Sequence, residues 1–241
     1  MPRMSLLESF SNGKKKLAVL IDPDNYNEHS LKYIVELAES NKVAYWLVGG
    51  SLLYGSNFEN TIKFLKTNSV IPVVIFPGNS FQVSGNADGI LFLSLVSGRN
   101  ATYLIEQQVI AAPAVKQANI EVIPTAYILV EGGKTSTTSY ITQTIPIPAD
   151  KPEIAATTAL AASFLGMKAV YLEAGSGASN PVNAVMIEAV KKAVQLPVIA
   201  GGGIVNAATA LAAFNAGADM VVVGNILERQ PEVLNQIGAI L

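Results

Sequence analysis

Short apolar runs alternate along this chain with longer segments in which apolar residues recur at helical spacing. The short runs are apolar almost without interruption, which is typical of strands buried on both faces of a parallel sheet. Strands that alternate with helices in this way indicate βαβ units. Eight runs fit strands: Leu17–Asp22, Ala44–Val48, Pro72–Phe76, Gly89–Leu93, Val122–Tyr127, Ala169–Glu173, Pro197–Ala200 and Met220–Gly224.

Helical spacing is clear in seven further segments. We predict helices over Glu28–Asn41, Phe58–Asn68, Tyr103–Gln117, Glu153–Leu165, Pro181–Ala193, Asn206–Ala216 and Pro231–Ile240. Asn206 and Asn180 are the predicted N-caps of two of these helices, because an asparagine side chain can accept a hydrogen bond from a free N–H of the first turn. Pro181 would then take the first position of its helix, where no N–H is needed.

The length of the chain suits one closed barrel of such units. A (β/α)₈ barrel typically takes about 250 residues, and this chain has 241. No Pro- or Ser-rich linker and no change in composition divides it. We therefore predict the α/β class, with a single (β/α)₈ TIM-barrel domain over residues 1–241.

Two connections depart from the alternation. After Phe76 the linker PGNSFQVSGNAD is too short and too rich in Gly and Pro for a crossover helix, so we expect a barrel modified around the third crossover. The segment Ile128–Lys151 has little helical period. Long irregular segments in compact domains are usually functional lids or interfaces. Tyr140 in this segment is either an interface anchor or an ordinary surface aromatic.

Composition narrows the choice of partners. Hydrophobic residues make up 50% of the chain and charged residues 14%, which favours large buried surfaces such as a barrel core plus the interface of a homo-oligomer. The net charge is −2, and the longest basic run is Lys14–Lys16, so we expect no nucleic-acid partner. The absence of cysteine excludes disulfides and thiolate metal sites, and it suits a cytoplasmic protein.

The sequence predicts neither a signal peptide nor a membrane span. Met1–Phe10 lacks the continuous apolar core of a signal peptide. Between Lys192 and Asp219 there is no charge, over a length that could span a membrane. Pro197 and the three glycines Gly201–Gly203 divide this stretch into a short strand, a tight loop and an Ala-rich helix.

In a (β/α)₈ barrel, active sites lie at the carboxyl ends of the strands. The first strand ends in Asp22, Pro23 and Asp24. A carboxylate there could hold Mg²⁺ together with water and a substrate phosphate; alternatively, Asp24 caps the next helix and Asp22 braces the loop. The second strand ends in Gly49–Ser51, which could bring its backbone and the Ser51 hydroxyl to a ligand, or could be a simple tight turn.

The last three strands carry the clearest chemical signal. The sixth ends in the sequence YLEAGSG (Tyr171–Gly177), whose glycine-rich loop could cradle an anion while Glu173 accepts a proton from a nearby hydroxyl. The alternative is a Glu173 paired with a lysine at the rim. Gly201–Gly203 and Gly224–Asn225 follow the seventh and eighth strands, where loops of this fold often bind phosphate. We therefore predict a phosphate site at the ends of these three strands.

Two further polar residues have weaker cases. His29, the single histidine, stands at the start of a predicted helix, and we expect it to be solvated. Arg99 follows the fourth strand and could reach a diphosphate or form a salt bridge at the rim.

Five motifs in order, LIDPDN, VGGS, YLEAGSG, AGGGI and VVGN, resemble the geranylgeranylglyceryl phosphate synthase family over nearly the whole chain. That resemblance implies a phosphoglycerol geranylgeranyltransferase, which joins a long prenyl group from its diphosphate to the 3-hydroxyl of sn-glycerol 1-phosphate. A related branch uses heptaprenyl diphosphate, and the sequence does not decide the chain length. The family forms dimers and hexamers, and its lipid-like product implies transient proximity to a membrane.

The resemblance also implies roles for individual residues. Mg²⁺ would bind at Asp22 and Ser51. Glu173 and Tyr171 would be catalytic, with Glu173 removing the proton of the hydroxyl. The residues implied to bind glycerol phosphate are Tyr171, Leu172, Glu173, Ala174, Gly175, Ser176, Gly177, Gly202, Gly203, Gly224 and Asn225.

A prenyl chain requires an apolar trough, for which we name Phe76, Phe92 and Tyr127 as candidates. Two rival functions stay open at this point. One is an isomerase or lyase on another phosphate-binding barrel, which would usually carry a catalytic Asp, Lys or Cys on an early strand and would need no trough. The other is a non-catalytic phosphate-binding protein that kept the barrel.

Overall fold

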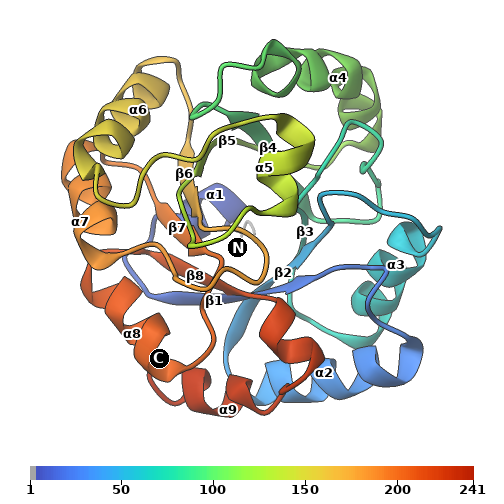
Figure 1. Cartoon of the computed structure of the whole chain (residues 1–241). Coiled ribbons are helices and arrows are strands. Elements are labelled where there is room, and N and C mark those ends of the chain that lie inside the picture. Colours follow the sequence, from blue (N-terminus) through green and yellow to red (C-terminus); the bar gives the residue numbers. More distant parts are fainter. Residues whose placement is uncertain (1–3) are drawn as a thin grey trace.

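A computed structural model describes residues 4–241 and contains a closed barrel of eight parallel strands. The strands follow one another around the barrel in chain order, and the last pairs with the first (Figure 1). This confirms the predicted (β/α)₈ fold. The strands are β1 (Lys16–Ile21), β2 (Val43–Val48), β3 (Val73–Ile75), β4 (Gly89–Leu95), β5 (Glu121–Leu129), β6 (Ala169–Glu173), β7 (Val198–Gly201) and β8 (Met220–Val223).

Most of the helices surround this barrel (Figure 1). The α-helices are α1 (Leu6–Phe10), α2 (Glu28–Ser40), α3 (Phe58–Asn68), α4 (Gln107–Ala118), α5 (Thr137–Thr142), α6 (Pro152–Phe164), α7 (Ala184–Ala193), α8 (Ala207–Asn215) and α9 (Val233–Gly238). A π-helical turn, η1 (Thr102–Glu106), precedes α4, and a 3₁₀ turn, η2 (Asn225–Glu228), follows β8. Residues 76–88, all of them described, contain no helix, as predicted for the third crossover.

One predicted helix start is confirmed and another is wrong. Asn206 caps α8 by accepting a hydrogen bond from the backbone N–H of Thr209 at 2.9 Å. Helix α7 is capped by Asn183 and not by Asn180, so Pro181 lies before the helix. The backbone N–H of Asn180 instead donates to a carbonyl of the β5–α6 segment. Since Asn180 and Asn183 are equally good cap residues, only this loop contact decides between them.

The strands are apolar throughout because both of their faces are buried. In β2, Leu47 points into the barrel, whereas its neighbours Trp46 and Val48 pack outward with the surrounding helices. Residues of α3 such as Ile62 and Leu65 belong to this outer layer. Side chains alternate between the two faces of a strand, so a strand with two buried faces loses the apolar–polar alternation of an exposed sheet.

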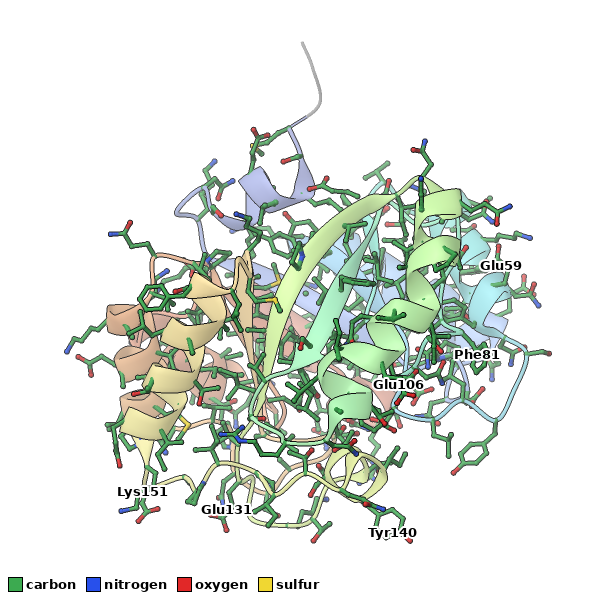
Figure 2. The ribbon with its side chains drawn as sticks, turned by 90° about the horizontal axis from the view of Figure 1, so that it is seen from above. Glu59, Phe81, Glu106, Glu131, Tyr140 and Lys151 are labelled. Carbon is green, nitrogen blue, oxygen red and sulfur yellow. The ribbon has the colours of Figure 1, made fainter. Side chains whose placement is uncertain are left out.

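Helix α1, which we did not predict, closes the amino-terminal end of the barrel. Phe10 is 1% exposed, and its ring centroid lies 4.9 Å from that of Tyr45. The Glu121 carboxylate accepts hydrogen bonds from the N–H groups of Leu6 and Leu7 at 2.7 and 2.9 Å. Figure 2 shows α1 at one end of the molecule and the labelled Tyr140 of α5 at the other. The cavity of a barrel closed at this end can open only at the carboxyl ends of the strands.

Within residues 4–241, no helix has both the length and the apolar character needed to cross a membrane. The charge-free stretch forms β7, a glycine loop and α8, as predicted.

We predict that Phe10→Ala lowers the free energy of unfolding by about 3–5 kcal/mol, because it leaves a cavity under the barrel. Phe164→Ala is the matched control; Phe164 is 82% exposed, so its loss should cost less than about 0.5 kcal/mol. Urea denaturation of the two variants measures the difference. Equal, small effects would mean that α1 does not dock into the barrel.

Candidate active site

A cavity of about 730 Å³ opens at the carboxyl ends of the strands. Loops that follow the strands line it together with part of the β5–α6 connection. Ten of the predicted site residues lie in its wall: Asp22, Ser51, Tyr171, Glu173, Ser176, Gly177, Gly202, Gly203, Gly224 and Asn225. Leu172 and Ala174 instead pack between the barrel and its helices, and Gly175 does not line the cavity but donates its N–H to Glu173.

Glu173, at the end of β6, is buried in this wall without a cationic partner. It is 5% exposed, and none of the ion pairs among residues 4–241 includes it, so the alternative of a rim salt bridge is wrong. Burial raises the pKa of this carboxyl to about 7, although a hydrogen bond from the Gly175 N–H, at 2.7 Å, works in the opposite direction. A carboxylate with such a pKa is suited to accept a proton at neutral pH.

Three aromatic rings gather beside Glu173 in the mouth of the barrel. Tyr171 stacks on Phe76 with 4.9 Å between ring centroids, and Tyr127 lies 5.5 Å from Tyr171. Burial and the nearby Glu173 raise the pKa of Tyr171 well above its usual value, so its hydroxyl keeps its proton. That buried hydroxyl interacts with the Glu173 carboxylate, although no hydrogen bond of normal geometry joins the two within residues 4–241. It can therefore turn to a ligand that binds beside Glu173.

The glycine loops after β6 and β7 come close to each other at Glu173. Gly202 has a φ of +79°, and a Cβ atom there would lie 2.6 Å from the Glu173 carboxylate. Only glycine fits this position, because other residues would clash and would rarely adopt this backbone conformation. The Ser176 hydroxyl donates to the Asn225 side chain at 2.8 Å, which joins the β6 loop to the β8 loop. The loops after the last three strands thus form one polar wall.

Asp22 and the β2 loop lie together on the opposite side of the cavity mouth. A Cβ atom on Gly50 would lie 3.0 Å from the Asp22 carboxylate. Burial, and to a smaller extent the charge of Asp24, raises the pKa of Asp22, although a hydrogen bond from the Asp24 N–H works against this. Asp24 itself accepts hydrogen bonds from the β2 loop, including one from the Tyr54 N–H at 2.6 Å. It does not cap α2, which is capped by Asn27.

The donors on this side fit Mg²⁺. Asp22 provides a half-buried carboxylate, and Ser51 provides a hydroxyl on the adjacent loop. Among residues 4–241 there is no group of three or more acidic or histidine side chains that could enclose an ion. Magnesium commonly takes one or two carboxylates and leaves its other positions to water and substrate phosphate.

Part of the β5–α6 connection crosses the mouth as a strap, defined here as residues 131–146 and including α5 (Figure 1). The Thr138 hydroxyl lies 3.0 Å from that of Ser51, within hydrogen-bond distance. The backbone carbonyl of Thr142 accepts a hydrogen bond from the Asn100 side chain at 2.9 Å. Tyr140 is exposed and points away from the barrel, where either an interface anchor or an ordinary surface aromatic could lie (Figure 2).

Sequence reasoning missed several cavity residues. Gln82, buried at 3% exposure, donates to the Gly50 carbonyl at 2.8 Å and accepts from the Gly78 N–H at 3.2 Å, so it ties the β2 and β3 loops together. Glu228 accepts from the Asn25 side chain at 3.0 Å and links the β8 and β1 loops. Neither residue belongs to a motif that could have identified it; their roles depend on contacts between distant loops.

Two other polar residues lie outside the cavity. Arg99 is exposed, does not line the cavity wall, and donates a hydrogen bond to the Gly98 carbonyl at 2.8 Å. The expected reach to a diphosphate is therefore not supported by its position, and no acidic partner forms a rim salt bridge with it among residues 4–241. His29 is exposed at the start of α2, as predicted.

Comparison with known proteins places the chain among relatives of the same length. It is 45% identical to the geranylgeranylglyceryl phosphate synthase of Spirosoma linguale, covering 99% of this chain and 96% of that protein. Identity to the Pyrococcus abyssi protein of the same name is 41%, covering 93% and 89%.

A solved structure agrees over the whole fold. The (S)-3-O-geranylgeranylglyceryl phosphate synthase of Thermoplasma acidophilum, crystallised with its substrate sn-glycerol-1-phosphate, superposes with a TM-score of 0.92 at 35% identity. The alignment covers 99% of this chain and 97% of that one. The sequence profile of the PcrB family matches residues 12–241. With a match over nearly its entire length, the chain belongs to the PcrB family.

Proposed function

We propose that this protein is a prenyltransferase that joins a long prenyl group, geranylgeranyl in the first instance, to the 3-hydroxyl of sn-glycerol 1-phosphate. The observation that carries the proposal is the buried Glu173, whose raised pKa suits a base, beside glycine loops suited to a phosphate. Relatives at 41–45% identity carry the name geranylgeranylglyceryl phosphate synthase. Heptaprenyl diphosphate is the alternative donor.

Glycerol phosphate would bind on the side of the last three strands. Backbone N–H groups of the loops at Ser176–Gly177, Gly202–Gly203 and Gly224–Asn225 are suited to hold its phosphate, because loops with positive φ and helix starts present N–H groups to anions. The glycerol hydroxyl would then point toward Glu173, and the Tyr171 hydroxyl, which lies beside this carboxylate, would help to orient it.

The reaction forms a C–O ether bond and breaks the bond between the prenyl carbon and the diphosphate. Glu173 would accept the proton of the attacking hydroxyl as the ether bond forms. Phe76 and Tyr127 cover the reacting atoms and keep water, a competing nucleophile, away from the prenyl cation.

Asp22 and Ser51 would hold Mg²⁺ on the diphosphate side of the mouth. When bound, the ion neutralises the charge that develops on the departing diphosphate. Burial and the nearby charge of Asp24 raise the pKa of Asp22, and a divalent ion would stabilise its ionised form.

The prenyl chain would extend toward the side of the barrel at the third crossover, where residues 76–88 contain no helix to cover the strands. The cavity continues there along apolar side chains. These include Val83, Ile90, Phe92, Tyr103 and Ala111. Phe92 is thus better placed to contact the far end of the chain than Phe76, which stacks on Tyr171.

The proposed function is tested by incubating the protein with Mg²⁺, radiolabelled sn-glycerol 1-phosphate and a series of prenyl diphosphates. We expect a phosphate that extracts into organic solvent, and a lower rate with sn-glycerol 3-phosphate. No extractable product with any donor would favour an isomerase, a lyase or a non-catalytic phosphate-binding protein.

We expect Glu173→Gln to lower turnover by about 10²–10⁴-fold while glycerol phosphate still binds, because the amide can accept the Gly175 hydrogen bond but not a proton. The rate of the wild-type protein should rise with pH up to about 7, where Glu173 becomes ionised, and then level off. Single-turnover rates across pH measure both effects. Glu131→Gln, an exposed strap residue outside the cavity, is the control. Full activity of Glu173→Gln would show that Glu173 is not the base.

Phe92→Ala should lengthen the trough and shift preference toward longer donors. We expect the ratio of kcat/KM for heptaprenyl over geranylgeranyl diphosphate to rise about ten-fold. Phe81→Ala provides the control, because Phe81 lies on the linker between β3 and β4 and points into solvent (Figure 2). An unchanged ratio in Phe92→Ala would place the trough elsewhere.

We also propose a homo-oligomer, a dimer or a hexamer, in the cytoplasm. Exposed apolar side chains on η1 and α4, such as Ile105 and Val109, support the presence of a subunit interface.

A further inference from the structure

Lys134, on the strap, is held directly beside the glycine loop that follows β6. On one side of it, the Gly132 carbonyl accepts a hydrogen bond from the Asn180 N–H at 3.1 Å. On its other side, Ser136 packs on Gly175, where an added Cβ atom would lie 2.6 Å from the Ser136 Cβ. These two contacts anchor the short segment that carries Lys134 against the polar wall of the cavity.

The ammonium group of Lys134 faces the glycine loop and lacks an acidic partner. Its Nζ lies 3.4 Å from the point that a Cβ atom on Gly177 would occupy, and Lys134 lines the cavity. The ion pairs within residues 4–241 use other cations. Gly177, with a φ of +62°, has no side chain to come between this cation and a ligand on the loop.

Carboxylates outnumber cations in the wall of the cavity, so few groups there could balance the charge of a phosphate. Three carboxylates line the wall, namely those of Asp22, Glu173 and Glu228, against two cations, Lys134 and Arg229. The charge of Arg229 acts on Glu228. Glycine N–H groups offer only partial charges to a phosphate. Lys134 is the cation that directly adjoins Gly177, so it would offer a full positive charge to a phosphate that approaches the Gly175–Gly177 loop.

We propose that Lys134 is a substrate-binding residue that contacts the phosphate of glycerol phosphate from the strap, beside the glycine loop that follows β6. This assignment rests on the proposed function. It gives the strap a role in substrate selection, because the lysine favours glycerol phosphate over uncharged glycerol. Lys134 would bind the glycerol phosphate and not the prenyl diphosphate. The residues proposed to hold Mg²⁺ for the diphosphate, Asp22 and Ser51, lie across the mouth.

The test compares Lys134→Met, which keeps the length of the side chain but removes its charge, with Lys151→Met. Lys151 is an exposed lysine just beyond the strap that points away from the barrel and pairs with Asp150 at 3.9 Å (Figure 2). Isothermal titration measures the Kd of each variant for sn-glycerol 1-phosphate without prenyl diphosphate. Steady-state kinetics then give KM for both substrates and kcat.

We expect Lys134→Met to weaken binding of glycerol phosphate about ten-fold and to raise its KM similarly, while KM for the prenyl diphosphate changes less than about two-fold. Lys151→Met should behave as wild type. An unchanged Kd in Lys134→Met, or a larger effect on the prenyl diphosphate, would overturn the assignment while leaving the proposed function intact. If the wild-type protein itself bound no glycerol phosphate, the proposed function would fail and the assignment with it.

Discussion

Glu173 is an ionisable carboxyl that the barrel has taken out of water without giving it a cation. Removing an ionised carboxylate from water is costly, and the hydrogen bond from the Gly175 N–H offsets only part of that cost. The arrangement around it follows from this constraint. Gly202 has no side chain because one would contact the carboxylate. The neighbouring Tyr171 keeps its proton because it is buried and because a second negative charge beside Glu173 would be unfavourable. The burial of Glu173 thus lowers the stability of the fold, and it provides a base that can accept a proton at neutral pH.

The cavity mouth has two chemically different halves, which the strap joins. The half formed by the loops after β6, β7 and β8 is rich in glycine and contains Glu173, whereas the β1 and β2 loops bring Asp22 and Ser51 together. Thr138 on the strap lies within hydrogen-bond distance of Ser51, while Ser136 packs on the β6 loop. The two halves of the mouth are therefore suited to two separate phosphate groups, and the strap covers both halves.

The barrel could be predicted from the sequence because strands buried on both faces leave uninterrupted apolar runs, and the bounds of α3 were predicted to the residue. Helix α1 was missed because a five-residue helix has no measurable period; its Ser5–Glu8 capping box was the available signal. The candidate residues at strand ends were named from the sequence because this fold places the carboxyl ends of its strands at one edge, and most of them line the cavity. Gln82 and Lys134 were not, since their positions depend on how loops and the strap fold across the mouth.

The most direct test of the buried carboxyl is the free energy of unfolding of wild-type protein and Glu173→Gln, measured from pH 4.5 to 8. Because the folded pKa is about 7 and the unfolded value about 4.5, the folded state binds the proton more tightly, and ionisation destabilises it as pH rises. The variant lacks this penalty. We predict that the free energy of unfolding of the variant, relative to that of the wild type, rises between these pH values by at most about 3 kcal/mol. Above pH 8 this difference should stay constant. A difference that does not change with pH would contradict the account.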